Sequence, residues 1–132
     1  MIHIRQMLHN EIKHHMPFKT QDTGIWLEAS ELKQPLAIFQ LLEQTKIVGN
    51  LHAHTIKEHE NKSIHRKVMP EVLDWIRQNT GYEKVIGTVA EGNIKVRAIL
   101  AKHAFRVCGI ISNGIIENNQ LQNLLIFELN LR

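Results

Sequence analysis

One strand–helix–strand segment constrains the fold of this chain more than any other feature. Residues 47–56, IVGNLHAHTI, alternate in the manner of a half-buried strand. Residues 68–81, VMPEVLDWIRQNTG, carry the apolar spacing of a helix, and Pro70 suits its first turn, so the helix is expected to begin near Val68. Residues 84–89, KVIGTV, are typical of a buried parallel strand. This order predicts a right-handed parallel crossover and therefore a mixed α/β fold.

The N-terminal third carries weaker patterns. Apolar residues recur at helical spacing over residues 4–15, and Pro17 is placed to end such a helix. Two short apolar runs, at residues 25–29 and 36–43, are expected to form strands. This part of the chain therefore adds one helix and two strands to the central crossover.

The C-terminal third has clearer signals. Asn93 is placed to cap a helix that ends near Phe105. Residues 106–116 and 121–131, which the polar ENNQ separates, predict an antiparallel hairpin. The whole chain, 1–132, is thus predicted to be a single α/β (α+β) domain. Its mixed sheet would contain a central parallel strand pair, with flanking helices and a C-terminal antiparallel hairpin.

Composition is that of an ordinary globular chain, with 43% hydrophobic and 22% charged residues. No apolar run is long enough to span a membrane, and the first residues lack the core of an export signal, so a cytoplasmic location is expected. The formal net charge of +3 is spread along the chain without a basic run, so a nucleic-acid surface is not expected. The single cysteine, Cys108, is expected to be a buried structural thiol.

Histidines are the most conspicuous polar residues of the central strand. Strand alternation puts His52 and His54 on one face, and His59 and His65 follow nearby. Residue type alone would allow a metal site, but the spacing matches no recognised ligand set, so no metal is expected. The plainest interpretation is that these are surface or hydrogen-bonded histidines.

The segment EGNIKVRAILAKHAF, residues 91–105, follows an apolar strand and resembles the GNAT superfamily of N-acetyltransferases. The signature of that family is an Asn, a small residue three positions on, a Tyr seven positions on, and then Gly-Phe. Its counterparts here are Asn93, Val96, Leu100, Ala104 and Phe105. The resemblance implies that the strands on either side of the central helix splay apart. Acetyl-CoA would lie in the gap, with its pyrophosphate at the N-terminus of that helix.

The same resemblance implies a function and a set of site residues. The protein would bind acetyl-CoA or a related acyl-CoA and transfer the acyl group to an amine, with His52 or His54 as the base. Asn93 would contact the pantetheine arm. The family's glycine-rich phosphate loop is replaced by ENKSIHRKVM, residues 60–69, where side chains would hold the phosphates instead. Those side chains are Lys62, His65, Arg66 and Lys67.

Two departures leave a second function open. The phosphate loop has no glycine, and Leu100 stands where the family's Tyr protonates the departing thiolate. The chain also resembles the short GNAT-like proteins of tailed phages and prophages, which implies a non-catalytic structural or head-assembly role, in a virion or its host cell. A second copy of the chain, pairing through the apolar strand LLIFELNL at residues 124–131, is another candidate partner; the alternative is that this strand lies inside the sheet.

Overall fold

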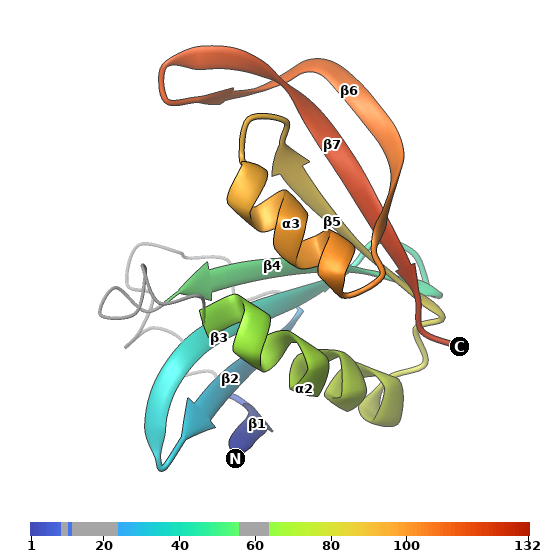
Figure 1. Ribbon diagram of the computed structural model, residues 1–132. Helices are drawn as coiled ribbons and strands as arrows, with labels where there is room; N and C mark the ends of the chain where they lie inside the picture. Colours follow the sequence, from blue (N-terminus) through green and yellow to red (C-terminus); the bar gives the residue numbers. More distant parts are fainter. Residues whose placement is uncertain (9–10, 12–23, 56–63) are drawn as a thin grey trace.

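The computed structural model describes residues 1–8, 11, 24–55 and 64–132. Within these ranges the chain forms a seven-stranded sheet of order β1-β2-β3-β4-β5-β7-β6, with two helices packed on it (Figure 1). The elements are β1 (Ile2–Gln6), β2 (Ile25–Glu31), β3 (Gln34–Glu43), β4 (Val48–Thr55), α2 (Ile64–Asn79), β5 (Lys84–Ala90), α3 (Ile94–Lys102), β6 (Arg106–Glu117) and β7 (Gln120–Asn130).

The sheet is mixed, as the sequence predicts. Strands β4 and β5 pair in parallel, and each of the other neighbouring pairs is antiparallel. Strands β6 and β7 form the expected hairpin, joined by Asn118 and Asn119 with left-handed φ angles of 54° and 61°. A two-residue turn of that conformation matches the twist of the strands that it joins.

Both helices cover the same face of the sheet (Figure 1). Helix α2 contacts β1, β2, β3 and β4. Leu100 of α3 and Phe105, which follows this helix, belong to the same buried cluster as Leu125 and Phe127 of β7. The larger of two buried clusters contains side chains from nearly every element, including Leu27, Phe39, Val68, Val72, Ile76, Val85, Leu100, Phe105 and Phe127. Burying a set of this size is the main stabilising term of a small domain.

The predicted helix over residues 4–15 is wrong at its beginning. Residues Ile2–Gln6 form β1, which pairs antiparallel with β2 from Ile2↔Glu31 to Gln6↔Leu27. Ile4, Met7 and Leu8 have the spacing of a helix, but Ile2 and Ile4 have that of a strand, and the edge of β2 supplies the backbone partners that favour the strand. Pro17 lies outside the described residues.

The central helix begins earlier than expected, at Ile64 rather than near Val68, so Pro70 lies in its interior. Pro70 has no N–H to give to the Arg66 carbonyl, a loss that normally disfavours a helix. The buried stripe that includes Ile64 offsets this cost.

His103, the C-cap residue of α3, lies against the Arg66 carbonyl. Burial lowers the pKa of His103, and a hydrogen bond to Arg66 opposes that shift.

Two further expectations about the C-terminal strands need correction. Cys108 is exposed rather than buried, because it lies in the edge strand β6. The apolar segment 124–131 falls mostly in β7, which lies between β5 and β6, so its backbone is already paired on both sides. Among the described residues, none of the helices is both long and apolar enough to cross a membrane.

Candidate functional site

Strands β4 and β5 separate part-way along their length. Their parallel register consists of Val48↔Lys84, Gly49↔Val85 and Asn50↔Ile86, yet β4 continues to Thr55 and β5 to Ala90. The other edges of both strands stay paired to their ends, β4 with β3 and β5 with β7. The sheet therefore opens in its middle, on the C-terminal side of Asn50 and Ile86.

The opening exposes peptide groups of β4. Val48 directs its N–H and C=O away from β5, since both bond to the preceding turn: its C=O accepts from the Gln44 N–H at 2.9 Å, and its N–H donates to the Thr45 C=O at 3.3 Å. Successive residues of a strand direct these groups to alternate edges. Leu51 and Ala53 therefore direct theirs towards β5, and the Leu51 C=O and Ala53 N–H lie beyond the last paired residues.

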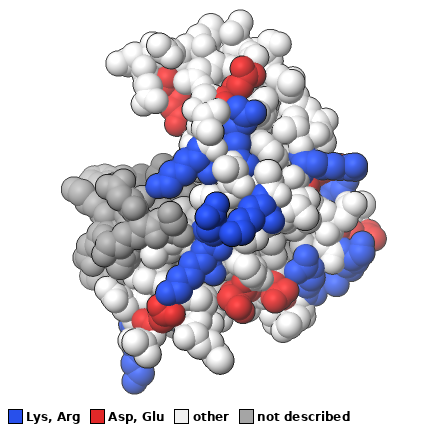
Figure 2. All heavy atoms as spheres, in the orientation of Figure 1, with Lys and Arg blue, Asp and Glu red and all other residues white. Residues whose placement is uncertain are grey.

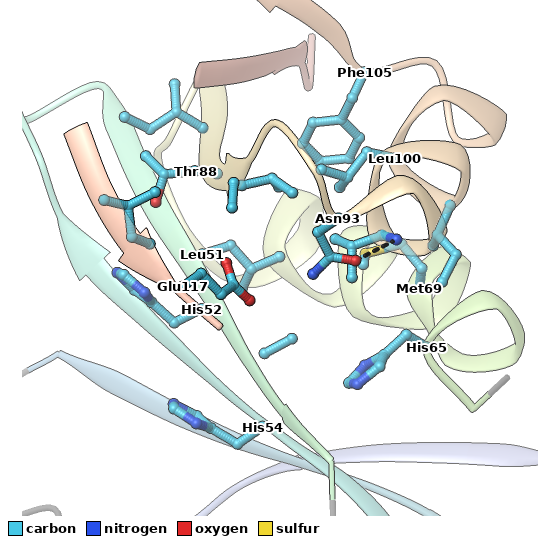
Figure 3. Close-up of a pocket in the computed structure, with 18 residues that line it drawn as sticks. Leu51, His52, His54, His65, Met69, Thr88, Asn93, Leu100, Phe105 and Glu117 are labelled. Carbon is cyan, nitrogen blue, oxygen red and sulfur yellow. Dashed lines mark hydrogen bonds between the residues drawn. The ribbon is translucent and has the colours of Figure 1, made fainter. Parts of the chain in front are cut away.

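A cavity of about 330 Å³ occupies this opening (Figure 3). Its walls come from β4, β5, both helices and the end of β6. The apolar lining includes Leu51, Met69, Ile86, Val89, Leu100 and Phe105, and the polar lining includes His52, His54, His65, Thr88, Asn93 and Glu117. A mostly apolar cavity with a few polar groups is the usual form of a small-molecule site.

Asn93 lies where β5 gives way to α3. Its Oδ1 accepts a hydrogen bond from the Val96 N–H at 3.2 Å, which is the predicted helix cap. The amide nitrogen of the same side chain is directed into the cavity (Figure 3). One residue can therefore both begin the helix and offer a donor to a ligand. Leu100, two turns further along the helix, lines the cavity with an apolar side chain.

The three histidines approach the cavity from two sides. His52 and His54 pair with Gln40 and Ile38 of β3, so they share the face of the sheet that is opposite to the helices. His65 comes from the first turn of α2, on the helix side, and its ring meets the edge of Phe39 with centroids 5.7 Å apart. The cavity thus passes through the sheet between these two groups.

The environments of the histidines differ. Burial lowers the pKa of His52, which favours a neutral imidazole at pH 7. Burial also lowers the pKa of His65, and nearby His54 and Lys95 lower it further. The His54 ring stacks on the indole of Trp26 with centroids 5.9 Å apart. Burial therefore favours the neutral imidazole at both His52 and His65, while the ring of His54 lies against an aromatic side chain.

The structure has close counterparts among solved acetyltransferases. The spermidine/spermine N-acetyltransferase SpeG from Vibrio cholerae, in mutant forms, superposes with a TM-score of 0.82 at 12% identity, over 99% of this chain and 95% of that one. An acetyltransferase of the GNAT family from Streptococcus pneumoniae superposes with a TM-score of 0.74 at 14% identity, over 98% and 99%. This chain has the GNAT fold. No family model and no curated protein matches the sequence.

Within this GNAT fold, the predicted phosphate-binding residues take different positions. Lys62 lies outside the described residues. His65 lines the cavity, whereas the Lys67 ammonium is 2.7 Å from a carboxylate oxygen of Glu31, on the β2–β3 hairpin. Arg66 lies close enough to His103 to lower the pKa of that imidazole, as Lys102 also does. Figure 2 shows Lys and Arg side chains gathered over the face that α2 and α3 form.

The sequence did not point to Thr88, Met69 or Glu117 as site residues. Glu117 reaches the cavity because β6 shifts register between Ile111 and Ile115, a bend that no sequence pattern signals. Within the described ranges, no three His, Cys, Asp or Glu side chains are grouped as a metal site would need. His59 lies outside those ranges.

Proposed function

We propose that this protein binds acetyl-CoA or a related acyl-CoA in the opening between β4 and β5 and transfers the acyl group to an amine. The observation that carries the proposal is the divergence of the two strands beyond Asn50 and Ile86, which leaves peptide groups of β4 beside an Asn-capped helix. The two solved structures compared above are acetyltransferases, and SpeG is named for spermidine and spermine.

The residues present support direct transfer. The amine nitrogen attacks the thioester carbonyl carbon, the C–S bond breaks, and coenzyme A leaves as a thiolate. His52 accepts the proton that the amine loses. The Ala53 N–H, directed towards β5, is placed to donate to the carbonyl oxygen as negative charge develops on it. Leu100 cannot donate a proton, so the thiolate takes its proton from solvent.

The cationic face of α2 and α3 supplies a site for the phosphates of the donor. Arg66, Lys95 and Lys102 lie on these two helices. Lys95 is close enough to the cavity residue His65 to affect its pKa, and Arg66 and Lys102 lie close to His103, next to the end of α3. Lysine and arginine side chains would replace the backbone N–H groups of a glycine loop. Asn93 would donate its amide to the pantetheine arm.

Acetyl-CoA is expected to raise the melting temperature of the protein. A ligand at about 100 times its dissociation constant stabilises the native state by about 2.7 kcal/mol, which amounts to several degrees for a domain of this size. Differential scanning fluorimetry with acetyl-CoA, coenzyme A and ATP, the last as a polyanion control, measures the effect. An unchanged melting temperature at millimolar acetyl-CoA would contradict the proposal.

An assembly role without catalysis is the second candidate, and the surface of β6 favours it. This strand is a sheet edge, and its side chains of Ile110 and Ile116 are 59% and 73% exposed. Long apolar edges usually pair or are covered. We propose a second copy of the chain as the partner at β6.

Self-association through β6 is expected to depend on these isoleucines. The double substitution Ile110→Lys and Ile116→Lys should weaken the dimer at least about tenfold, because each lysine would bring a charge into an apolar contact. Sedimentation velocity over a dilution series measures this. The matched control is Ile47→Lys, at a 52% exposed isoleucine outside β6. A wild-type protein that stays monomeric at high concentration would exclude β6 as a self-association surface.

A further inference from the structure

Glu117 places a carboxylate in the cavity. It is the last residue of β6, half-buried, and its carboxylate is directed into the cavity between His52 and Asn93 in Figure 3. No salt bridge or side-chain hydrogen bond engages this carboxylate among the described residues. It is also the sole acidic side chain that lines the cavity within those ranges.

The position of Glu117 is fixed by contacts of its backbone. Gln122 of β7 joins the end of the hairpin to the turn between β5 and α3: its Nε2 donates to the Glu117 C=O at 3.4 Å, and its Oε1 accepts from the Gly92 N–H at 2.8 Å. The two-residue turn at Asn118 and Asn119 follows directly. The backbone of Glu117 is therefore linked through Gln122 to the turn that precedes α3, while its side chain lines the cavity.

The charge of Glu117 is opposite to that of the helix face. Lys and Arg side chains gather over α2 and α3 (Figure 2), which suits an anionic acyl donor. A carboxylate in the same cavity repels such a donor and attracts a cation. The amine acceptor is the cationic reactant at neutral pH, so its charge suits Glu117, whereas the charge of the anionic donor suits the helix face.

Proton chemistry limits which nitrogen Glu117 can bind. The attacking nitrogen must be neutral, and a carboxylate in contact with it would stabilise its protonated form. An ammonium that does not react has no such requirement. A carboxylate thus assists the reaction best when it holds a second positive charge on the acceptor, while His52 accepts the proton of the reacting nitrogen.

Building on the proposed function, we infer that Glu117 binds a second cationic group of the acceptor, so the preferred acceptors are aliphatic amines that carry another ammonium or guanidinium group. Glu117 is then a specificity residue, and it accepts hydrogen bonds from the cation without taking part in proton transfer. A charged hydrogen bond of this kind accounts for about tenfold in affinity.

Isothermal titration with two amines of equal length tests the inference without turnover. Wild-type protein should bind 1,4-diaminobutane about tenfold more tightly than butylamine. Glu117→Gln, which keeps the shape but removes the charge, should bind both at the butylamine level. Glu71→Gln, at an exposed position on α2, is the matched control and should behave as wild type. Equal binding of the two amines by wild type, or an unchanged preference in Glu117→Gln, would overturn the inference.

Turnover separates this role from a catalytic one. With acetyl-CoA as donor, Glu117→Gln should raise KM for 1,4-diaminobutane about tenfold and leave kcat within about twofold. An equal fall in kcat for both amines would place Glu117 on the reacting nitrogen and overturn the inference. If acetyl-CoA neither binds nor reacts while diamine binding still depends on Glu117, the proposed transferase function fails and the cation site stands.

Discussion

Substituting Gly87 by leucine is expected to abolish the thermal stabilisation by acetyl-CoA while the protein still folds. Gly87 is the first residue of β5 beyond the last pair with β4, and it lines the cavity. A Cβ built at Gly87 has the Leu51 carbonyl oxygen as its nearest neighbour, at 3.7 Å, which is ordinary contact. The added side chain therefore has space to enter, and that space is the opening itself. If the leucine side chain fills this space, acetyl-CoA cannot bind, and the stabilisation of the native state by about 2.7 kcal/mol that the ligand would provide is lost.

The matched control is Gly81→Leu, where a Cβ has no neighbour within 4 Å. Both substitutions remove a glycine and add the same side chain, but Gly81 lies outside the cavity lining. Scanning fluorimetry without ligand first shows whether each variant folds, since overpacking can cost about 1–3 kcal/mol. A folded Gly87→Leu variant that keeps the full shift with acetyl-CoA would place the donor elsewhere on the molecule.

The crossover at the centre of the fold was predictable because its elements differ in period. Residues 47–56 alternate, residues 68–81 repeat at helical spacing, and residues 84–89 are apolar throughout. The first strand was not predictable in this way. Ile2 and Ile4 are too few to separate a period of two from one of 3.6, and the deciding interaction is the edge of β2, which is distant in sequence.

The residues of the candidate site also differ in whether the local sequence predicts their positions. Alternation within one strand places His52 and His54 on one face, and a cap pattern places Asn93 at the start of a helix. The positions of all three residues were therefore predictable from their neighbours in the sequence. The stacking of Trp26 on His54 depends on the register of three strands. Glu117 depends on a shift of register within β6. Neither has a local signal, although His54 and Glu117 both line the cavity.

Replacing His52 by alanine is expected to lower kcat by about 10²-fold or more, the usual contribution of a positioned general base. Both His52 and His54 line the cavity, but the His54 ring is stacked on the buried Trp26, which suits a structural role. Steady-state acetylation of an amine, with coenzyme A release as the readout, measures the loss. His3→Ala, at an exposed histidine of β1, is the matched control and should keep wild-type rates.

The same role for His52 predicts how the rate of acetylation changes with pH. Burial disfavours the charged imidazolium, so the pKa of His52 lies below its ordinary value of 6.5 and the basic form predominates at neutral pH. The wild-type rate should therefore rise with pH and reach half of its plateau below pH 6.5. In His52→Ala this acidic limb should disappear, because the group that titrates is gone. If the limb remains, and if kcat falls only in His54→Ala, the base is His54 and the burial of His52 serves the fold alone.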